Sequence, residues 1–246
     1  MPCTGHDHDH EDEDQLGLSL QSYIDMDQVY TLNEFIPNSG KLVLKPYSDR
    51  LSLSPSLLSQ QDEDDVELLI HIPFTEAVSI RSISISGRSS VFIPDGNNGS
   101  LATSAPYSAK VFVNRTDLDF DLARELPPDA NIELLPPEHV SEVQTPNNDS
   151  HKGGTLDYPL RPAVKFKYCN CITIFFGDNY AQKISESQGQ IDIADAIPTE
   201  ITYIGFKGAG TGTKRVAVEC IYETKGMKKD HKVPDGEFGA KESKMQ

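Results

Sequence analysis

The segment from Val66 to Ser86 alternates apolar and polar residues with a period of two, and this alternation constrains the fold more than any other feature. Side chains at every second position of a β-strand lie on one face, so the pattern predicts strands rather than an amphipathic helix. We predict a first strand that ends at Pro73, because proline has no N–H to donate to a sheet. In the second strand the alternation shifts phase near Arg81 and Ser82, where one extra residue, a β-bulge, would restore the facing.

The same pattern recurs later in the chain. Further strands are predicted within residues 109–113, 132–135, 164–168, 172–176, 201–206 and 216–222. The separations between them often exceed a tight hairpin, so the connections should cross between sheets. A helical turn is expected within residues 20–30. Three loop-like insertions interrupt the pattern, at residues 88–106, 136–158 and 184–198. The sequence therefore predicts an all-β sandwich or jelly roll.

The chain has 246 residues and a formal net charge of −16. Binding to nucleic acid requires clustered Lys and Arg, so this charge argues against a nucleic-acid partner and favours basic protein partners. The first ten residues lack the basic and apolar regions of a secretory signal, and no run of about 18 apolar residues could span a bilayer. We expect an intracellular monomer with no cofactor and no membrane contact.

Polar segments stand at both ends of the chain. Residues 1–17 are rich in His and acids, and residues 223–246 are rich in Lys. Both carry too little apolar surface to offset the entropy of ordering, so we expect disordered tails around a domain of residues 18–222. The four cysteines form no C-x-x-C pair. They are expected to be free thiols, with Cys169 and Cys171 buried.

The N-terminal tail carries metal-ligating side chains at Cys3, His6, His8 and His10. Thiolate and imidazole groups suit zinc, nickel or copper. An unfolded tract, however, fixes neither the coordination geometry nor the groups that orient the ligands. Two interpretations stay open, a weak metal site and a solvated tail, and the second is favoured.

An acidic run precedes the first strand, at Asp62, Glu63, Asp64 and Asp65. Its members do not converge from separate elements, so the run does not indicate a metal site or a general acid. It is either a solvated edge that deters aggregation between strands or a docking patch for a basic partner. His71 is expected to be exposed or hydrogen-bonded rather than a catalytic base, because no Ser, Cys or Asp can be paired with it from the sequence.

The segment after the strand at 109–113 comes closest to a ligand site. Asn114, Asp117 and Asp119 place amide and carboxylate groups next to Phe120 at a strand exit. Asn and Asp also form turns at such positions, and this structural interpretation is favoured. The glycine-rich residues 205–214 lack the spacing of a phosphate-binding loop, so a flexible hairpin is expected there.

Four blocks in this order and spacing resemble the PITH domain, the proteasome-interacting thioredoxin-like domain. They are DEDDVELLIHIPFTEAVSIRSISISG (62–87), AKVFVNRTDLDFDLA (109–123), YPLRPAVKFKYCNCITIFFGDN (158–179) and ITYIGFKG (201–208). The chain carries no thioredoxin domain, so it resembles the stand-alone members. The redox activity of thioredoxin-like relatives is not implied, since the reactive cysteine pair is absent.

The resemblance implies a jelly-roll β-sandwich of the galactose-binding-domain-like type and association with the regulatory particle of the proteasome, in cytoplasm and nucleus. We therefore expect a non-enzymatic adaptor. The expected partner-binding residues are Asp62, Glu63, Asp64, Asp65, Asn114, Asp117, Asp119, Lys225, Lys228 and Lys229. The alternative is a module that binds a small ligand or carbohydrate at the loop end of the sandwich. Fold alone does not decide between the two.

Overall fold

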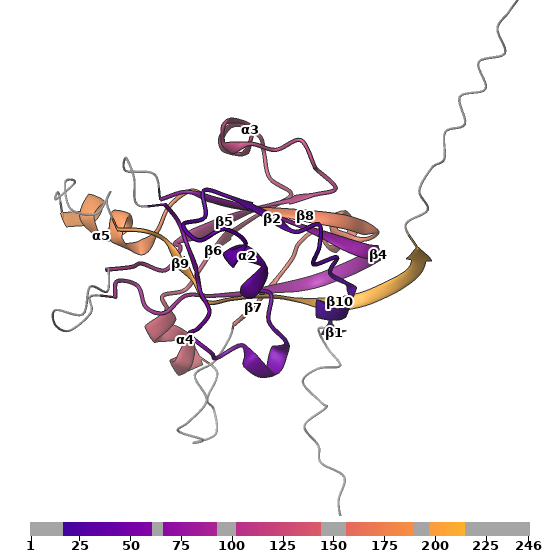
Figure 1. The fold of residues 1–246 in the computed structure, drawn as a ribbon, viewed down its shortest axis with the longest axis horizontal. Coiled ribbons are helices and arrows are strands. Elements are labelled where there is room, and N and C mark those ends of the chain that lie inside the picture. The colour runs from indigo at the N-terminus through magenta and orange to yellow at the C-terminus, as the bar shows by residue number, and fades with distance from the viewer. Residues whose placement is uncertain (1–16, 61–65, 93–101, 144–155, 189–196, 215–246) are drawn as a thin grey trace, which may run out of the picture. The chain divides into compact units, whose positions relative to one another are not determined.

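The structure is a computed structural model and describes residues 17–60, 66–92, 102–143, 156–188 and 197–214. Its elements in chain order (Figure 1) are β1 (Leu18–Ser19), η1 (Gln21–Tyr23), β2 (Tyr30–Leu32), α2 (Ser39–Leu42), η2 (Tyr47–Asp49), β3 (Leu57–Leu58), β4 (Leu68–Ser86), β5 (Ser108–Val113), α3 (Phe120–Glu125), β6 (Ala130–Glu133), α4 (Pro137–Val143), β7 (Asp157–Pro159), η3 (Ala163–Phe166), β8 (Cys169–Phe176), α5 (Tyr180–Gln188), β9 (Glu200–Ile201) and β10 (Tyr203–Lys214). Within these stretches, no helix is long and apolar enough to cross a membrane.

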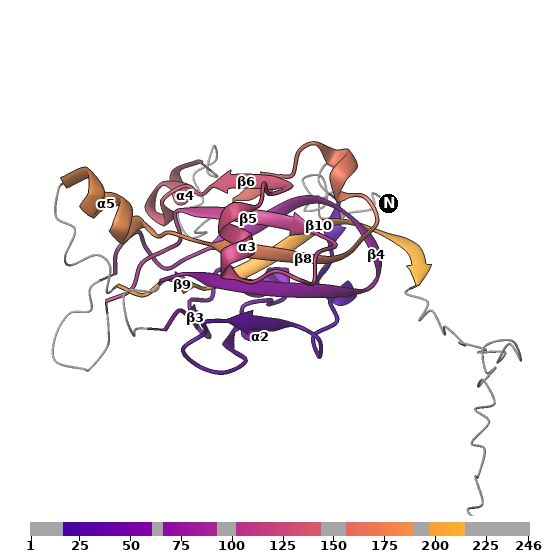
Figure 2. The ribbon, with the colours of Figure 1, turned by 90° about the horizontal axis from the view of Figure 1, so that it is seen from above.

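Strand β4 is 19 residues long and belongs to both layers of the fold. Its first half pairs with β2 and β8, and its second half pairs with β10 and β7, all antiparallel. β5 and β6 extend the first layer, and β1 extends the second. Figure 2 shows β4 curving round at one end, so that its halves contribute to opposite layers. The prediction of an all-β jelly-roll sandwich is confirmed.

The predicted break at Pro73 is only half correct. The register between β4 and β8 shifts between Pro73 and Val78, as expected for a residue that cannot donate to the ladder. The strand itself does not end there, because β10 pairs with β4 from Glu76 onward. One strand therefore stands where the sequence predicts two.

The predicted bulge near Arg81 and Ser82 is confirmed. Ser82 pairs with Lys207 of β10, whereas the next pair joins Ile80 to Gly208, so Arg81 is the extra residue on β4. A bulge of this kind restores the alternation of the two faces.

The core lies between the two layers. Its buried apolar side chains come from alternate positions of both halves of β4, such as Ile70, Ile72, Ile83 and Ile85, and from β5, β8 and β10. Leu20 next to η1 joins this core, which confirms the helical turn expected near the N-terminal end of the domain. A smaller cluster under α3 covers the outer face of β4 and β8. The prediction that Cys169 and Cys171 are buried free thiols is also confirmed.

The prediction of a flexible, glycine-rich hairpin at residues 205–214 is wrong, because these residues belong to strand β10. The glycines serve close packing instead of a turn. A Cβ atom at Gly208 would lie 2.0 Å from the Ser79 carbonyl oxygen, and one at Gly205 would lie 2.2 Å from the Tyr203 hydroxyl oxygen. Gly208 therefore reflects the close approach of β10 to β4, and Gly205 makes room for the Tyr203 ring of β10 itself.

The strand expected at residues 164–168 is also wrong. Ala163–Phe166 forms the 3₁₀ helix η3, and Tyr168 has a left-handed backbone with φ of 56°. Only Phe166 is buried, while Val164 and Tyr168 are exposed. The apolar residues alternate here, but only the Phe166 ring packs into the core, so the alternation does not mark a strand. Strand β8 begins only at Cys169.

A buried carboxylate joins the connections at one end of the sandwich. Glu200 accepts hydrogen bonds from Arg88 Nε at 3.1 Å, Arg88 Nη2 at 3.1 Å and the Thr103 hydroxyl at 2.6 Å. The Glu200 amide donates to the Ser104 carbonyl oxygen at 2.7 Å. Because the carboxylate is buried, these donors replace the water that it loses on folding.

Substitution of Gly208 by Ala should lower the free energy of unfolding by about 1–3 kcal/mol, since the added methyl group overlaps the Ser79 carbonyl. Denaturant unfolding followed by circular dichroism measures this change. The matched control is Gly212→Asn, because no atom lies within 4 Å of that position and its φ of 70° suits asparagine. Equal stability of G208A and wild type would contradict the packing role of this glycine.

Substitution of Glu200 by Gln should destabilise the fold by about 1–3 kcal/mol, because it removes the negative charge that pairs with Arg88. The free energy of unfolding by urea is the measurement. Glu186→Gln breaks an exposed pair with Lys183 and should leave stability nearly unchanged. A similar effect of both substitutions would show that the burial of Glu200 is unimportant.

Candidate functional site

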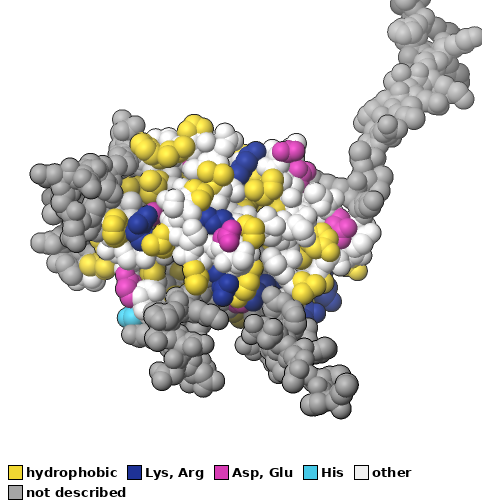
Figure 3. All heavy atoms as spheres, turned by 60° about the horizontal axis from the view of Figure 1, so that its bottom comes forward, with side chains coloured by type: hydrophobic (Ala, Val, Ile, Leu, Met, Phe, Trp, Pro, Cys, Tyr) yellow, Lys and Arg dark blue, Asp and Glu magenta, His cyan; other side chains and the backbone are white. Residues whose placement is uncertain are grey.

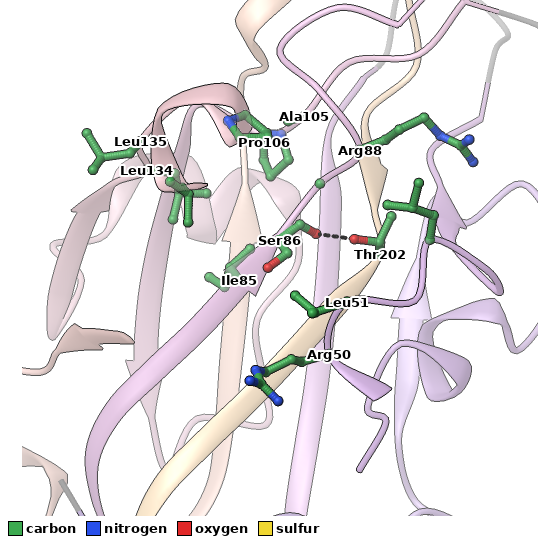
Figure 4. Close-up of a pocket in the computed structure, with 14 residues that line it drawn as sticks. Arg50, Leu51, Ile85, Ser86, Arg88, Ala105, Pro106, Leu134, Leu135 and Thr202 are labelled. Carbon is green, nitrogen blue, oxygen red and sulfur yellow. Dashed lines mark hydrogen bonds between the residues drawn. The ribbon is translucent and has the colours of Figure 1, made fainter. Parts of the chain in front are cut away.

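A pocket with a volume of about 300 Å³ opens at the end of the sandwich where β4 finishes. Figure 4 shows the residues that line it as sticks. They come from the segment after η2, the end of β4, the Ala105–Pro106 turn before β5, and the connection from β6 to α4. Thr202 adds a contribution between β9 and β10. The pocket is thus built only when segments far apart in the sequence come together.

The first wall consists of the segment after η2. Lys45 lies beneath it and donates from Nζ to the Ser52 carbonyl oxygen at 2.9 Å. Arg50 donates from Nη1 to the Tyr47 carbonyl oxygen at 3.0 Å and stacks on the Tyr47 ring, with its Cζ atom 4.1 Å from the ring centroid. Lys207 of β10 lies over the same ring at 4.6 Å. These contacts fix a segment that has little regular structure of its own.

The opposite wall is held by tyrosine side chains. The Leu135 amide donates to the Tyr158 hydroxyl oxygen at 2.8 Å, and the Tyr180 hydroxyl donates to the Leu134 carbonyl oxygen. Burial raises the pKa of both phenols. Both therefore remain neutral at physiological pH, and their role here is to position Leu134 and Leu135.

One backbone carbonyl among the residues that line the pocket is satisfied within the protein. The Ser86 carbonyl oxygen accepts hydrogen bonds from the Thr202 amide at 2.8 Å and from the Thr202 hydroxyl at 3.1 Å (Figure 4). At Gly87, an added Cβ atom would lie 2.6 Å from the Ala105 Cβ atom. Only a glycine therefore lets the end of β4 approach Ala105 this closely.

Exposed leucines surround the mouth of the pocket. Leu51, Leu53 and Leu135 expose 41%, 46% and 41% of their surface, a high fraction for large apolar side chains. On the face in Figure 3, hydrophobic side chains gather in patches between charged ones. Apolar side chains that ring a concave site are typical of binding surfaces.

The charged residues that line the pocket are both arginines, Arg50 and Arg88. Arg88 is neutralised by Glu200 at 3.1 Å. Among the described residues, no carboxylate lies within 4 Å of the Arg50 guanidinium. The pocket thus combines apolar walls with one cation at the rim.

The part of the chain that the structure describes contains no group of three or more His, Cys, Asp or Glu residues placed to hold a metal ion. Burial raises the pKa of the Cys169 thiol to about 12, so it stays protonated and unreactive. His71 is buried, stacks on Tyr30 with ring centroids 4.8 Å apart, and lies 2.8 Å from the Thr173 hydroxyl through Nδ1. The expectation of a hydrogen-bonded sheet histidine is confirmed.

The predicted residues between β5 and α3 have clear structural roles. Asn114 has φ of 54°, and its side-chain oxygen accepts from the Asn170 amide at 2.7 Å. Asp119 caps α3 by accepting from the Leu122 amide at 2.8 Å. Arg115 donates to Asp117 at 2.7 Å and holds the pKa of that carboxyl below its usual value.

These loop residues lie away from the pocket. Ala105 and Pro106 line the pocket just before β5, whereas Asn114 directly follows the last residue of β5. The two sites therefore stand at opposite ends of one strand. The other predicted site residues lie outside the described residues: Cys3, His6, His8, His10, Asp62, Glu63, Asp64, Asp65, Lys225, Lys228 and Lys229.

The pocket is not among the sites that the sequence predicts. One signal was present, because Leu51 and Leu53 alternate with serines in a segment that contains no predicted strand. Two leucines do not reveal a pocket, however, since the facing wall comes from Leu134 and Leu135, more than 80 residues later.

Comparison with solved structures finds the CBM32-1 and CBM32-2 domains of ZmpB from Clostridium perfringens, at 9% identity and a TM-score of 0.44. That match covers 82% of this chain and 40% of the other.

Among curated proteins, a PITH domain-containing protein of Drosophila melanogaster is 31% identical over 215 residues, which cover 87% of this chain and 81% of the relative. A PITH domain-containing protein of Schizosaccharomyces pombe is 29% identical over 213 residues, covering 87% of this chain and 83% of the relative. Human PITH domain-containing protein 1 is 28% identical over 219 residues, which cover 89% of this chain and 82% of the relative. The family model of the PITH domain matches residues 10–226, and the chain therefore belongs to the PITH domain family.

Proposed function

We propose that this protein is a non-enzymatic adaptor that associates with the regulatory particle of the proteasome through its PITH sandwich. The observation that carries the proposal is the match of the PITH family model to residues 10–226, nearly the whole chain. The family resemblance implies proteasome association, and with it a location in cytoplasm and nucleus.

The chemistry of the described residues supports binding rather than catalysis. Among the described residues that line it, the pocket has no carboxylate, histidine or cysteine. General acid–base or nucleophilic catalysis needs such groups within hydrogen-bonding distance of a substrate. A pocket that combines apolar side chains with two arginines, and lacks such groups among its described residues, suits recognition of a partner.

Two surfaces are proposed to take part in this association besides the pocket. One is the acidic run of residues 62–65, and the other is the loop that carries Arg115, Asp117 and Asp119, whose charged side chains are exposed. The Lys-rich residues 225–229 would add contacts of opposite charge. These charged segments would contribute to binding through charge complementarity with the partner.

The alternative of a carbohydrate-binding module gains less support from the pocket. Sugar rings are commonly held against an aromatic side chain, and in the part of the chain that the structure describes no residue that lines the pocket is aromatic. The leucine-rich mouth favours an apolar group instead.

Affinity purification of the tagged protein from cells should recover subunits of both the lid and the base of the proteasome regulatory particle. Recovery should fall as salt rises above physiological strength, because charges are already screened beyond about 8 Å there. Quantitative mass spectrometry against a tag-only control measures both effects. Absence of these subunits under gentle salt would contradict the proposal.

Neutralising the acidic run should weaken the association several-fold, because it removes charges that a basic partner would pair with. The variant is D62N/E63Q/D64N/D65N, with proteasome recovery as the measurement. The control D9N/E11Q/D12N/E13Q changes the net charge by the same amount elsewhere in the sequence. An equal loss with both variants would assign the effect to overall charge, and no loss with either would remove residues 62–65 from the interface.

A further inference from the structure

We infer that the pocket at the end of β4 binds an acidic peptide segment of a partner protein, with one or two large apolar side chains of the segment buried between the leucines and a neighbouring carboxylate paired with Arg50. This inference deepens the proposed function, since it names what the adaptor would recognise. Four features of the site carry it: its size, its floor, its mouth and its charge.

The size and floor of the pocket fit apolar side chains. About 300 Å³ is the lower end of the range for ligand pockets, enough for one or two large side chains rather than a cofactor. The Ser86 carbonyl oxygen at the floor accepts two hydrogen bonds from Thr202 within the protein. At this carbonyl a ligand therefore meets an acceptor that is already satisfied, where an apolar group displaces water without losing a hydrogen bond.

Covering the mouth of the pocket would be favourable, because it removes exposed leucine surface from water. Leu51, Leu53 and Leu135 leave two fifths or more of their surface in water, on walls that side-chain hydrogen bonds hold in place. Because those walls are fixed, little conformational entropy is lost when a ligand packs between them. Burial of such leucines is the dominant favourable term in peptide recognition.

The charge at the rim selects an acidic ligand. The chain has 38 acidic and 22 basic residues, yet the charged residues that line this pocket are two arginines. Arg88 is paired with Glu200, which leaves Arg50 as the cation that can meet a ligand. The planar guanidinium of Arg50 is already oriented by its stack on Tyr47 at 4.1 Å, and this favours a bidentate contact with a carboxylate.

Glu138 and Asp49 lie near this site, and neither forms an ion pair with Arg50 among the described residues. Glu138 on α4 accepts hydrogen bonds from the Ser90 amide at 2.8 Å and the Ser90 hydroxyl at 2.7 Å, so its carboxylate is held by another loop. Asp49 accepts from the Ser48 hydroxyl at 3.0 Å. Neither residue lines the pocket.

The test is selection of a randomised dodecapeptide library displayed on phage, with the full-length protein as bait. We expect enrichment of peptides in which a large apolar residue stands next to Asp or Glu. Non-specific attraction to a chain with a net charge of −16 would enrich basic peptides instead, so acidic peptides are a specific signature.

Selected peptides are then synthesised, and their dissociation constants are measured by fluorescence polarisation. Leu51→Asp should weaken binding by about tenfold or more, since it removes an apolar contact and opposes the ligand charge. Arg50→Gln should weaken it about threefold or more, and Arg50→Lys less. The matched controls are Leu42→Asp and Arg161→Gln, at exposed positions outside the pocket, which should change binding less than twofold.

The inference is overturned if no peptide is enriched, if the enriched peptides are basic or lack apolar residues, or if they bind Leu51→Asp as tightly as wild type. Circular dichroism and thermal unfolding of each variant establish that the fold is retained. A dimer in sedimentation velocity that Leu51→Asp dissociates would assign the pocket to a second copy of this chain and would also overturn it. Recovery of proteasome subunits by Leu51→Asp at wild-type level would leave the proposed function intact while separating it from this pocket.

Discussion

The fold depends on one strand that serves two layers. β4 supplies pairing partners to β2 and β8 with its first half and to β10 and β7 with its second. Because the same backbone crosses between the layers, apolar side chains from both of its halves face one core. The bulge at Arg81 keeps the apolar side chains of β4 on the core face. Without this extra residue, the register with β10 would turn them to the other face of the sheet.

The curvature of β4 also decides where a binding site can form. The end of the strand, Ser86 and Gly87, meets connections from three distant parts of the chain, and the pocket lies between them. Glu200 holds this region together from inside through Arg88, Thr103 and Ser104. Arg88 is therefore both a structural ion-pair partner and part of the pocket lining, which leaves Arg50 to act on a ligand. The loop with Asn114 lies at the other end of β5, so a partner that touched both would have to span the length of that strand.

Much of the fold could be predicted from the sequence, but the candidate site could not. Alternation of apolar residues located β5, β8 and the two halves of β4, and it placed the bulge to within one residue. It failed at η3, where a single buried ring, Phe166, imitates a strand pattern, and at β10, where the glycines imitate a turn. In both places the conformation is set by a neighbour that is distant in sequence, as when the Ser79 carbonyl leaves no room for a Cβ atom at Gly208.

The sequence by itself determined the class of fold and the burial of Cys169 and Cys171, because these follow from local periodicity and residue type. It also carried the resemblance to the PITH domain, through four blocks of similar sequence in the same order and spacing. Only the tertiary structure decided that β4 continues through Pro73, since Pro73 still pairs with Cys171 of β8 and β10 pairs with β4 from Glu76 onward. It likewise decided that Leu51 and Leu135 share one pocket with Arg50 at its rim. The physical reason is that the walls of a pocket come from segments far apart in the sequence, and no short-range pattern encodes which segments will meet.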